Sequence, residues 1–333
     1  MRRSRNPKKT SEPAARRARA PAPPVHGVLV LDKPRGPTSH DIVALVRRAL
    51  GTRSVGHAGT LDPMATGVLV VAVGEATKLV PYLTADDKEY EATVCLGVAT
   101  DTLDAEGAVT LRSAVPEHVD RAAVERAAAA FIGETMQRAP DVSAIRRGGE
   151  RLYEKARRGE DVDAPERKVV VHRVDVVEAR EHEIDLRVHC GKGFYVRALA
   201  RDLAAALGTC GHLSALRRIA SGAFAVTEAV DFERIRAAAD GDEDARVWVR
   251  SQLIRTADAC RSLPRATLDD AGENDARHGR PVPLARVTSG LGGALASGEP
   301  VALLAPSGEL VAIAVAAPEE GTLRVARGFS PAS

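Results

Sequence analysis

The chain has 333 residues, of which 44% are hydrophobic and 28% charged, and its formal net charge is +2. This composition is ordinary for a globular protein with one large or two smaller domains. No apolar run approaches the roughly 20 residues that span a bilayer, and the basic N-terminus lacks the apolar segment of a secretory signal, so we expect no membrane partner. The cysteines are far apart and form no CxxC pair, which is typical of reduced thiols in a cytoplasmic protein: Cys95, Cys190, Cys210 and Cys260.

Charge is distributed unevenly along the chain. Residues 1–24 contain eight Lys or Arg residues and one Glu, a net charge of +7, so the remaining chain carries −5. Their content of Pro, Ala, Arg and Ser predicts a disordered basic arm. A basic arm on a mildly acidic body favours a polyanionic partner, and the alternative is a solvated tail that aids solubility.

The first half of the chain alternates between apolar runs and amphipathic segments. Gly51 is expected to end the first helix, which Thr38 or Ser39 caps. Strict alternation of apolar residues marks one strand, and continuous apolar runs mark two buried strands. The predicted elements are strands over 28–31, 68–73 and 90–98, a helix over about 39–50, and a helix over about 116–132 that Gly133 ends.

The second half begins with a polar, basic insertion over about 134–165 and ends in short strands separated by turns. Several adjacent strand pairs favour a mixed α+β fold over a regularly wound parallel sheet. We expect an ordered first domain over 25–235, a helical connection over 236–262 and a small β domain over 263–329. The predicted elements are strands over 169–177, 184–190, 301–304, 310–316 and 322–326, and a helix that begins after Phe194 and ends at Gly208.

A single acidic residue, Asp62, lies in a turn that is bounded by glycine and proline. A run of apolar residues follows this turn. The stretch reads GHAGTLDPMATGVLVV over residues 56–71. Because Asp62 precedes Pro63, its backbone is biased toward extended angles, and Gly59 and Gly67 allow positive φ or close approach. A tight loop joined to a buried strand presents a reactive carboxylate on a rigid support. The simpler interpretation is an Asp that caps its own turn.

Together with Gly-Glu-Ala-Thr-Lys at residues 74–78, this stretch closely resembles the signature of the bacterial TruB-type tRNA pseudouridine synthases. The resemblance covers about residues 26–232 and is weaker over 263–329. It implies a mixed, largely antiparallel central sheet flanked by helices, followed by a small PUA-like RNA-binding β domain. It also implies an isomerase that converts the uridine at position 55, in the T-loop of tRNA, to pseudouridine after flipping the base out of the RNA.

The resemblance assigns roles to particular residues. Asp62 matches the nucleophile, and Arg197 in Gly-Phe-Tyr-Val-Arg matches the arginine that pairs with it and would keep the carboxylate ionised. Tyr90 matches the tyrosine that packs on the target base, and its hydroxyl is a candidate for helping to remove the C5 proton. Without the resemblance, Arg197 reads as a surface arginine and Tyr90 as a core aromatic. The motif leaves open whether Asp62 attacks C1′, attacks C6 or removes a ribose proton.

Further substrate contacts follow from the same resemblance. A histidine at the mouth of the site would stack in the gap left by the flipped nucleotide, and an apolar residue would line the pocket. Two lysines in family motifs are candidates for loop support or phosphate contact. The expected substrate-binding residues are His57, Tyr195, Leu216, Lys33, Lys78, Arg146 and Arg151.

The insertion over 134–165 carries six basic residues between positions 146 and 158, a density that suits phosphate contacts. The alternative is a solvated helix face balanced by Glu150 and Glu154. In the stand-alone bacterial family this segment is a thumb that closes on the tRNA T-arm, and guide-RNA-directed relatives lack it. We therefore expect a monomer that needs no guide RNA. Val142, where many relatives have an aromatic residue, puts one stacking contact of the thumb in doubt.

The reaction implied by the resemblance needs neither a cofactor nor a metal ion, because no group leaves the RNA and no redox change occurs. No His/Cys cluster has the sequence spacing of a zinc site. The signature of zinc nucleobase deaminases is missing, and residues 74–78 do not form a Walker A loop. A non-enzymatic RNA-binding or tRNA-folding module remains the alternative, and both roles could coexist in one protein.

Overall fold

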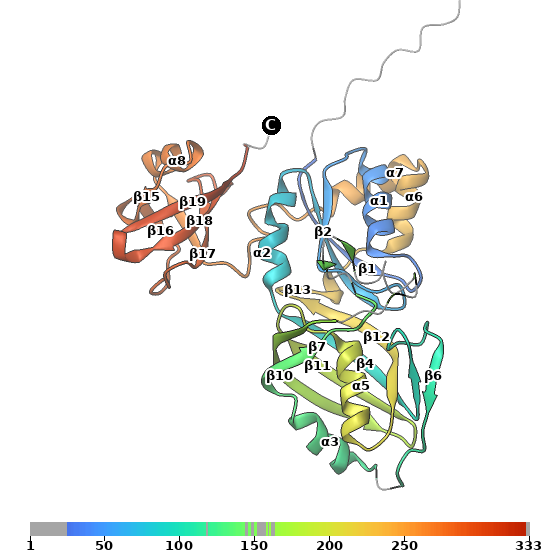
Figure 1. Cartoon of the computed structure of the whole chain (residues 1–333). Helices are drawn as coiled ribbons and strands as arrows, with labels where there is room; N and C mark the ends of the chain where they lie inside the picture. The colour runs from blue at the N-terminus through green and yellow to red at the C-terminus, as the bar shows by residue number, and fades with distance from the viewer. Residues whose placement is uncertain are drawn as a thin grey trace, which may run out of the picture.

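Two sheets dominate the protein in a computed structural model that describes residues 25–117, 119–143, 146–147, 150–151, 158, 160 and 164–330. The predicted arm, residues 1–24, lies outside the described residues. Over the described part of the chain the larger sheet has the order β1-β3-β12-β4-β11-β10-β7, with β2 paired to β3 and β13 paired to β12 (Figure 1). Its strands are β1 (Gly27–Lys33), β2 (Val55–Ala58), β3 (Thr66–Val73), β4 (Lys88–Leu96), β7 (Gly133–Arg138), β10 (Glu166–Ala179), β11 (Glu183–Cys190), β12 (Gly211–Ser221) and β13 (Phe224–Ala225).

The larger sheet is mixed and largely antiparallel, as predicted. Strands β3 and β12 run parallel, whereas the other neighbours in the sheet pair antiparallel. Residues of β4 alternate between buried and more exposed, with Tyr90, Ala92 and Val94 on the core side. The helices packed around the sheet are α1 (Ser39–Leu50), α2 (Val80–Ala85), α3 (Arg121–Ala129), α5 (Val196–Ala206), α6 (Phe232–Asp240) and α7 (Glu243–Ser251), with 3₁₀ turns η1 (Gly74–Leu79) and η2 (Val226–Glu228).

Helix α1 has the ends that the sequence predicts. The hydroxyl of Thr38 accepts a hydrogen bond from the backbone N–H of Asp41, whose carboxylate accepts one from the N–H of Thr38. This capping box satisfies two amides that the helix itself leaves unpaired. Gly51 follows the helix with φ 68°, a left-handed conformation that suits glycine. The cap fixes where α1 begins, and so places Ser39 beside the loop that carries Asp62.

Several boundaries differ from the prediction. Helix α3 begins at Arg121 because Asp120 caps it, so the predicted helix from about 116 is too long at both ends. Residues 134–138, assigned above to the insertion, belong to edge strand β7. Gly97, with φ 84°, ends β4 before the predicted residue 98. The segments that sequence analysis missed include the hairpin β5 (Val98–Thr100) and β6 (Val109–Arg112), and the short hairpin β8 (Arg146–Arg147) and β9 (Glu150–Arg151).

The predicted helical connection packs into the first unit. Helices α6 and α7 lie beside α1 (Figure 1), and Ile235 and Val249 are fully buried in the same core cluster as Val46 of α1. This segment therefore covers one side of the larger sheet. Burial of its apolar residues contributes stability at roughly 25 cal/mol per Å² of apolar surface.

The smaller sheet comprises the C-terminal β domain and has the order β15-β19-β18-β17-β14-β16. Its contact with the first unit is apolar, because Ile313 and Phe329 share a core cluster with Val30 and Leu79. Among the described residues, no helix is long and apolar enough to cross a membrane. The elements are β14 (Arg265–Leu268), α8 (Asp270–Arg277), β15 (Val282–Pro283), η3 (Leu284–Arg286), β16 (Val287–Ser289), β17 (Pro300–Leu304), β18 (Leu310–Ala317), η4 (Pro318–Glu320) and β19 (Thr322–Gly328).

Candidate active site

Asp62 lies on the loop between β2 and β3, and buried side chains support this loop through hydrogen bonds to its backbone. The Nζ of Lys33, which is 0% exposed, donates to the carbonyls of Pro34, Pro63 and Ala65 at 3.0, 3.2 and 2.8 Å. Burial lowers the pKa of Lys33 to about 8, and the negative charge of Asp62 opposes this shift. Lys33 therefore supports the loop and does not line the pocket above it.

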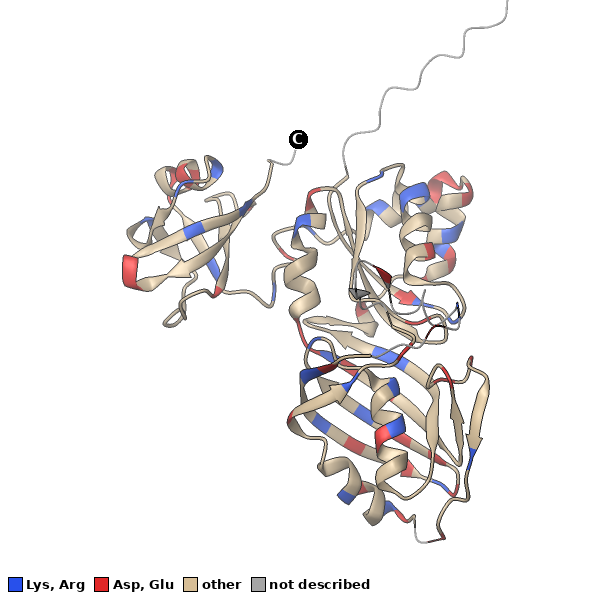
Figure 2. Cartoon of the chain, viewed as in Figure 1, with Lys and Arg blue, Asp and Glu red and all other residues tan. Residues whose placement is uncertain are grey.

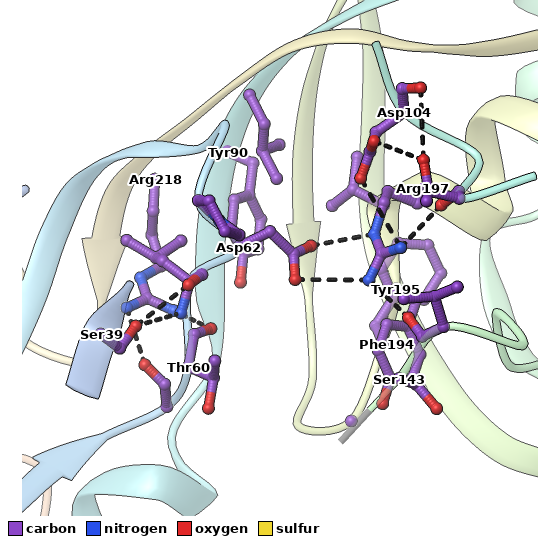
Figure 3. Close-up of a pocket in the computed structure, with 18 of the residues that line it drawn as sticks. Ser39, Thr60, Asp62, Tyr90, Asp104, Ser143, Phe194, Tyr195, Arg197 and Arg218 are labelled. Carbon is purple, nitrogen blue, oxygen red and sulfur yellow. Dashed lines mark hydrogen bonds and ion pairs between the residues drawn. The ribbon is translucent and has the colours of Figure 1, made fainter. Parts of the chain in front are cut away.

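Asp62 forms a two-point ion pair with Arg197 from the N-terminal turn of α5. Arg197 Nε lies 2.9 Å from Oδ2 of Asp62, and Nη2 lies 3.3 Å from Oδ1 (Figure 3). The Arg197 side chain is 5% exposed and that of Asp62 is 34% exposed. The pair holds the carboxylate in one orientation while part of it stays open to the pocket.

Arg197 is itself fixed by a loop that sequence analysis overlooked. Its Nη1 donates to the carbonyl of Thr102 at 2.7 Å and lies 3.7 Å from Oδ2 of Asp104, which is buried. Between them, Leu103 has φ 62°, the single positive φ of a non-glycine residue in the described chain. Such a conformation costs of order 1–2 kcal/mol and persists where the surroundings impose it, here beside a buried guanidinium.

The pocket around Asp62 is large and partly aromatic. Its volume is about 1330 Å³, more than the roughly 300–1,000 Å³ of ordinary small-molecule sites, so it has room for a nucleotide and its neighbours. Tyr90 from β4 and Leu216 from β12 are each 8% exposed and line it. Phe194 and Tyr195 line the side near Arg197 (Figure 3). Burial raises the pKa of Tyr90, so its hydroxyl remains protonated at neutral pH.

Arg218 is a second buried guanidinium at the pocket, and no role was predicted for it. It is 1% exposed, and its Nε donates to Val68 O at 2.7 Å while Nη2 donates to Gly59 O at 3.1 Å. Its partners thus come from both ends of the Asp62 loop. Leu216 and Arg218 are two residues apart on β12 and share its buried face, so period-two alternation beyond Leu216 was the available signal.

Two other predicted substrate-binding residues, His57 and Lys78, lie outside the pocket. His57 does not line the pocket, but its ring meets that of His40, which does, edge-to-face at 5.6 Å. Burial, with the nearby His40, lowers the pKa of His57 to about 4. Lys78 is outside the pocket, where it pairs with Glu75 at 2.6 Å and donates to Gly328 O at 3.0 Å. The side chains of Arg146 and Arg151, and most of the predicted thumb between residues 144 and 163, lie outside the described residues.

The arrangement provides one oriented carboxylate, buried cations and an apolar wall for a planar ring. This combination suits nucleophilic or electrostatic catalysis on a bound base. Among the described residues, one group of three potential metal ligands occurs, Asp87 with His172 and His189, and none of the three lines the pocket.

Two family models match adjoining parts of the chain. The TruB family pseudouridylate synthase (N terminal domain) matches residues 47–196, and the tRNA pseudouridylate synthase B C-terminal domain matches residues 197–259. Curated relatives named tRNA pseudouridine synthase B include one from Arthrobacter sp. (strain FB24), 42% identical over 86% of this chain and 92% of the relative. Another, from Thermobifida fusca (strain YX), is 50% identical over 63% of this chain and 74% of the relative.

Two solved structures of complexes contain a chain with a similar fold. A chain from a Cbf5-Nop10-Gar1 complex has a TM-score of 0.73 and 28% identity, covering 92% of this chain and 85% of that chain. A chain from an H/ACA RNP bound to a substrate RNA containing 2′-deoxyuridine has a TM-score of 0.71 and 27% identity, covering 92% and 86%. The likeness extends through both sheets, because it covers nearly all of the described chain.

Proposed function

Because the chain belongs to the TruB family of pseudouridylate synthases, which are isomerases, we propose that it converts uridine 55 in the T-loop of tRNA to pseudouridine with Asp62 as nucleophile. The observation that carries the proposal is the Asp62–Arg197 pair, oriented at two points and open to a pocket lined by Tyr90. The names of the curated relatives support tRNA as the substrate.

The isomerisation balances without a redox partner. The bond between N1 of uracil and C1′ of ribose breaks, a bond between C5 and C1′ forms, C5 loses a proton and N1 gains one. A carboxylate at C1′ or C6, or one that removes a ribose proton, would start the reaction, and all three routes need Asp62 ionised. The guanidinium of Arg197, with Nε 2.9 Å from Oδ2, holds the Asp62 carboxylate in place by a charge-assisted contact.

Tyr90 and the pocket walls hold the base while it turns. The target uridine must leave the folded T-loop, which costs a few kcal/mol, and the pocket volume leaves room for it. A flat aromatic ring contacts uracil in any in-plane orientation, so contact persists through the rotation. With a raised pKa, Tyr90 enters this chemistry as a phenol that donates or relays a proton, because a free phenolate is disfavoured.

The proposal extends to the partner and the setting. Basic residues between positions 146 and 158 would contact phosphates of the T-arm, and the enzyme would act as a monomer without guide RNA, without a cofactor and without a metal ion in the pocket. A cytoplasmic location is in keeping with four free thiols. Dialysis against EDTA should leave activity on folded tRNA unchanged, and a loss of activity that zinc but not magnesium restores would contradict the metal-free proposal.

The central experiment uses a tRNA transcript labelled with tritium at uridine C5. Wild-type protein should release the label. Asp62→Asn keeps the shape of the side chain without its charge, so it should abolish release while tRNA affinity stays within a few-fold. Asp240→Asn, an exposed carboxylate on α6 that pairs with Arg48, is the matched control. Label release by Asp62→Asn near the wild-type single-turnover rate would overturn the role of Asp62, whereas no release by the wild-type protein would leave the RNA-binding module as the alternative.

A further inference from the structure

Three potential ligands converge on the larger sheet outside the pocket. Asp87 precedes β4, and His172 and His189 belong to β10 and β11. The Nε2 atoms of His172 and His189 lie 3.1 and 3.8 Å from the same carboxylate oxygen, Oδ2 of Asp87. Their ring centroids are 4.6 Å apart, and one ligand atom from each residue lies within 4.8 Å of the others. Such convergence is the geometry of a site for one small ion.

A β-bulge brings His172 to this site. Val171 pairs with Cys190 and Arg173 pairs with His189, so His172 is an extra residue in β10 opposite β11. Regular alternation would direct His172 and Arg173 to opposite faces of the sheet. Instead both are exposed, between buried Val171 and Val174. Bulges redirect individual side chains in this way, and here the bulge places two histidines on one face.

We propose that Asp87, His172 and His189 bind one divalent transition-metal ion of the zinc class. Two imidazoles and one carboxylate suit Zn²⁺, whereas Mg²⁺ and Ca²⁺ prefer oxygen ligands alone. Tetrahedral ligands about 2.0–2.1 Å from zinc lie roughly 3.3 Å from one another. The separation between His172 and Asp87 already matches that value, and a modest movement of the His189 ring completes the set. A fourth position stays open to water.

The surroundings favour a structural role for the ion. Cys190 follows His189, but its thiol points to the core, where it is 1% exposed and donates to the carbonyl of Lys88. It does not extend the ligand set. The ligands come from the neighbouring strands β10 and β11 and from the residue that precedes β4, so a bound ion would cross-link the sheet just before Tyr90. This inference is independent of the proposed isomerisation, because none of the three residues lines the pocket.

The test is zinc titration of the full chain, free of any affinity tag, by isothermal calorimetry. Wild-type protein should bind one Zn²⁺ per chain. His172→Ala, His189→Ala and Asp87→Asn should each weaken binding by at least about tenfold, since changes even beyond the direct ligands cost 10–100-fold. His182→Ala is the matched control, because His182 is an exposed histidine beside Glu181 in the turn between β10 and β11, at the other end of β11 from His189. Its affinity should equal that of wild type.

Two further readouts separate this site from adventitious binding. Zinc should raise the unfolding temperature of wild type and His182→Ala, but not of His189→Ala, because an ion that binds the folded state stabilises it. Cobalt should give a tetrahedral visible spectrum without a thiolate charge-transfer band. A thiolate band, no saturable binding to wild type, or equal affinity in a His172→Ala/His189→Ala double variant would overturn the proposal.

Discussion

At the scale of residues, the site depends on buried cations that hold an accessible carboxylate. Arg197 is anchored by Thr102, Asp104 and the carbonyl of Val142, so its position does not depend on Asp62 alone. Removing one partner of a buried pair costs about 3–5 kcal/mol when the remaining charge is left alone. The additional partners of Arg197 reduce that penalty, which is why Asp62→Asn is a clean probe of chemistry.

Tyr90 has two functions that substitution can separate. Tyr90→Leu removes both the ring and the hydroxyl and should eliminate activity. Tyr90→Phe keeps the ring, so binding and cleavage of the glycosidic bond should survive. If the hydroxyl relays a proton, Tyr90→Phe should release tritium from C5 about 10²–10⁴-fold more slowly and accumulate an intermediate that retains the label. Single-turnover release at the wild-type rate would limit Tyr90 to contact with the base.

The lowered pKa of His57 predicts that the stability of the protein depends on pH. Its pKa falls from 6.5 when unfolded to about 4 when folded. Between these values the unfolded chain binds the proton and the folded chain does not, so acidification from pH 6.5 toward 4 removes stability, by up to about 3 kcal/mol for the full shift. Urea unfolding at pH 7 and pH 5 measures it. His57→Gln should have a smaller decrease in stability than wild type, and an equal decrease in the two proteins would contradict the assignment.

At the scale of elements, the loop bearing Asp62 is rigid because separate elements hold it. Lys33 comes from β1, Ser39 from α1 and Arg218 from β12. Ser39 Oγ donates to Leu61 O at 3.0 Å and accepts from Leu61 N at 2.9 Å. A loop supported in this way loses little conformational freedom when RNA binds, so substrate binding does not have to order it.

We therefore expect Arg218 to affect catalysis by holding the Asp62 loop in position. Arg218→Lys retains the charge but cannot reach the carbonyls of Gly59 and Val68 together. We expect kcat to fall by about tenfold or more, with KM for tRNA little changed, because small displacements of catalytic groups are costly. Arg217→Lys, at the neighbouring residue whose guanidinium pairs with Asp32 instead, is the comparison and should have a smaller effect. Equal kcat for Arg218→Lys and wild type would show that the loop is held without it.

At the scale of the whole molecule, acidic and basic residues are interspersed over the elements of both sheets (Figure 2). The apolar contact through Phe329 and Leu79 joins the sheets, and Lys78 reinforces the junction through Gly328. The arm before residue 25 carries a net +7, in contrast with this mixed surface. Its charge suits contacts with phosphates of any sequence.

Deleting residues 1–24 should weaken binding to all RNAs alike. The slope of log K against log salt should become shallower by about 0.7–0.9 for each phosphate that the arm no longer neutralises. A full-length variant with the eight Lys and Arg residues of the arm changed to Gln separates charge from chain length, and it should behave like the deletion. Unchanged affinity and slope at low salt would show that the arm does not contact RNA.

Local sequence predicted most elements and the key carboxylate. Alternation marked β4, Gly51 ended α1, and the turn around Asp62 identified the loop. Boundaries failed where a cap or a glycine outweighed periodicity, as at Asp120 and Gly97. Strand β7 was missed because an edge strand with one buried residue has little apolar pattern.

By itself, the sequence determined the family, the mixed fold, and the pairing of Asp62 with Arg197 that the resemblance implied. Tertiary structure alone decided which distant side chains support the pair. Arg218 and Lys33 are charged residues that local rules place at the surface, yet both are buried because backbone carbonyls of the Asp62 loop accept their hydrogen bonds. Asp87, His172 and His189 likewise meet only through strand register and a bulge. Such contacts arise between segments far apart in the chain, so a local pattern can assign a residue to a buried face but does not identify its partners.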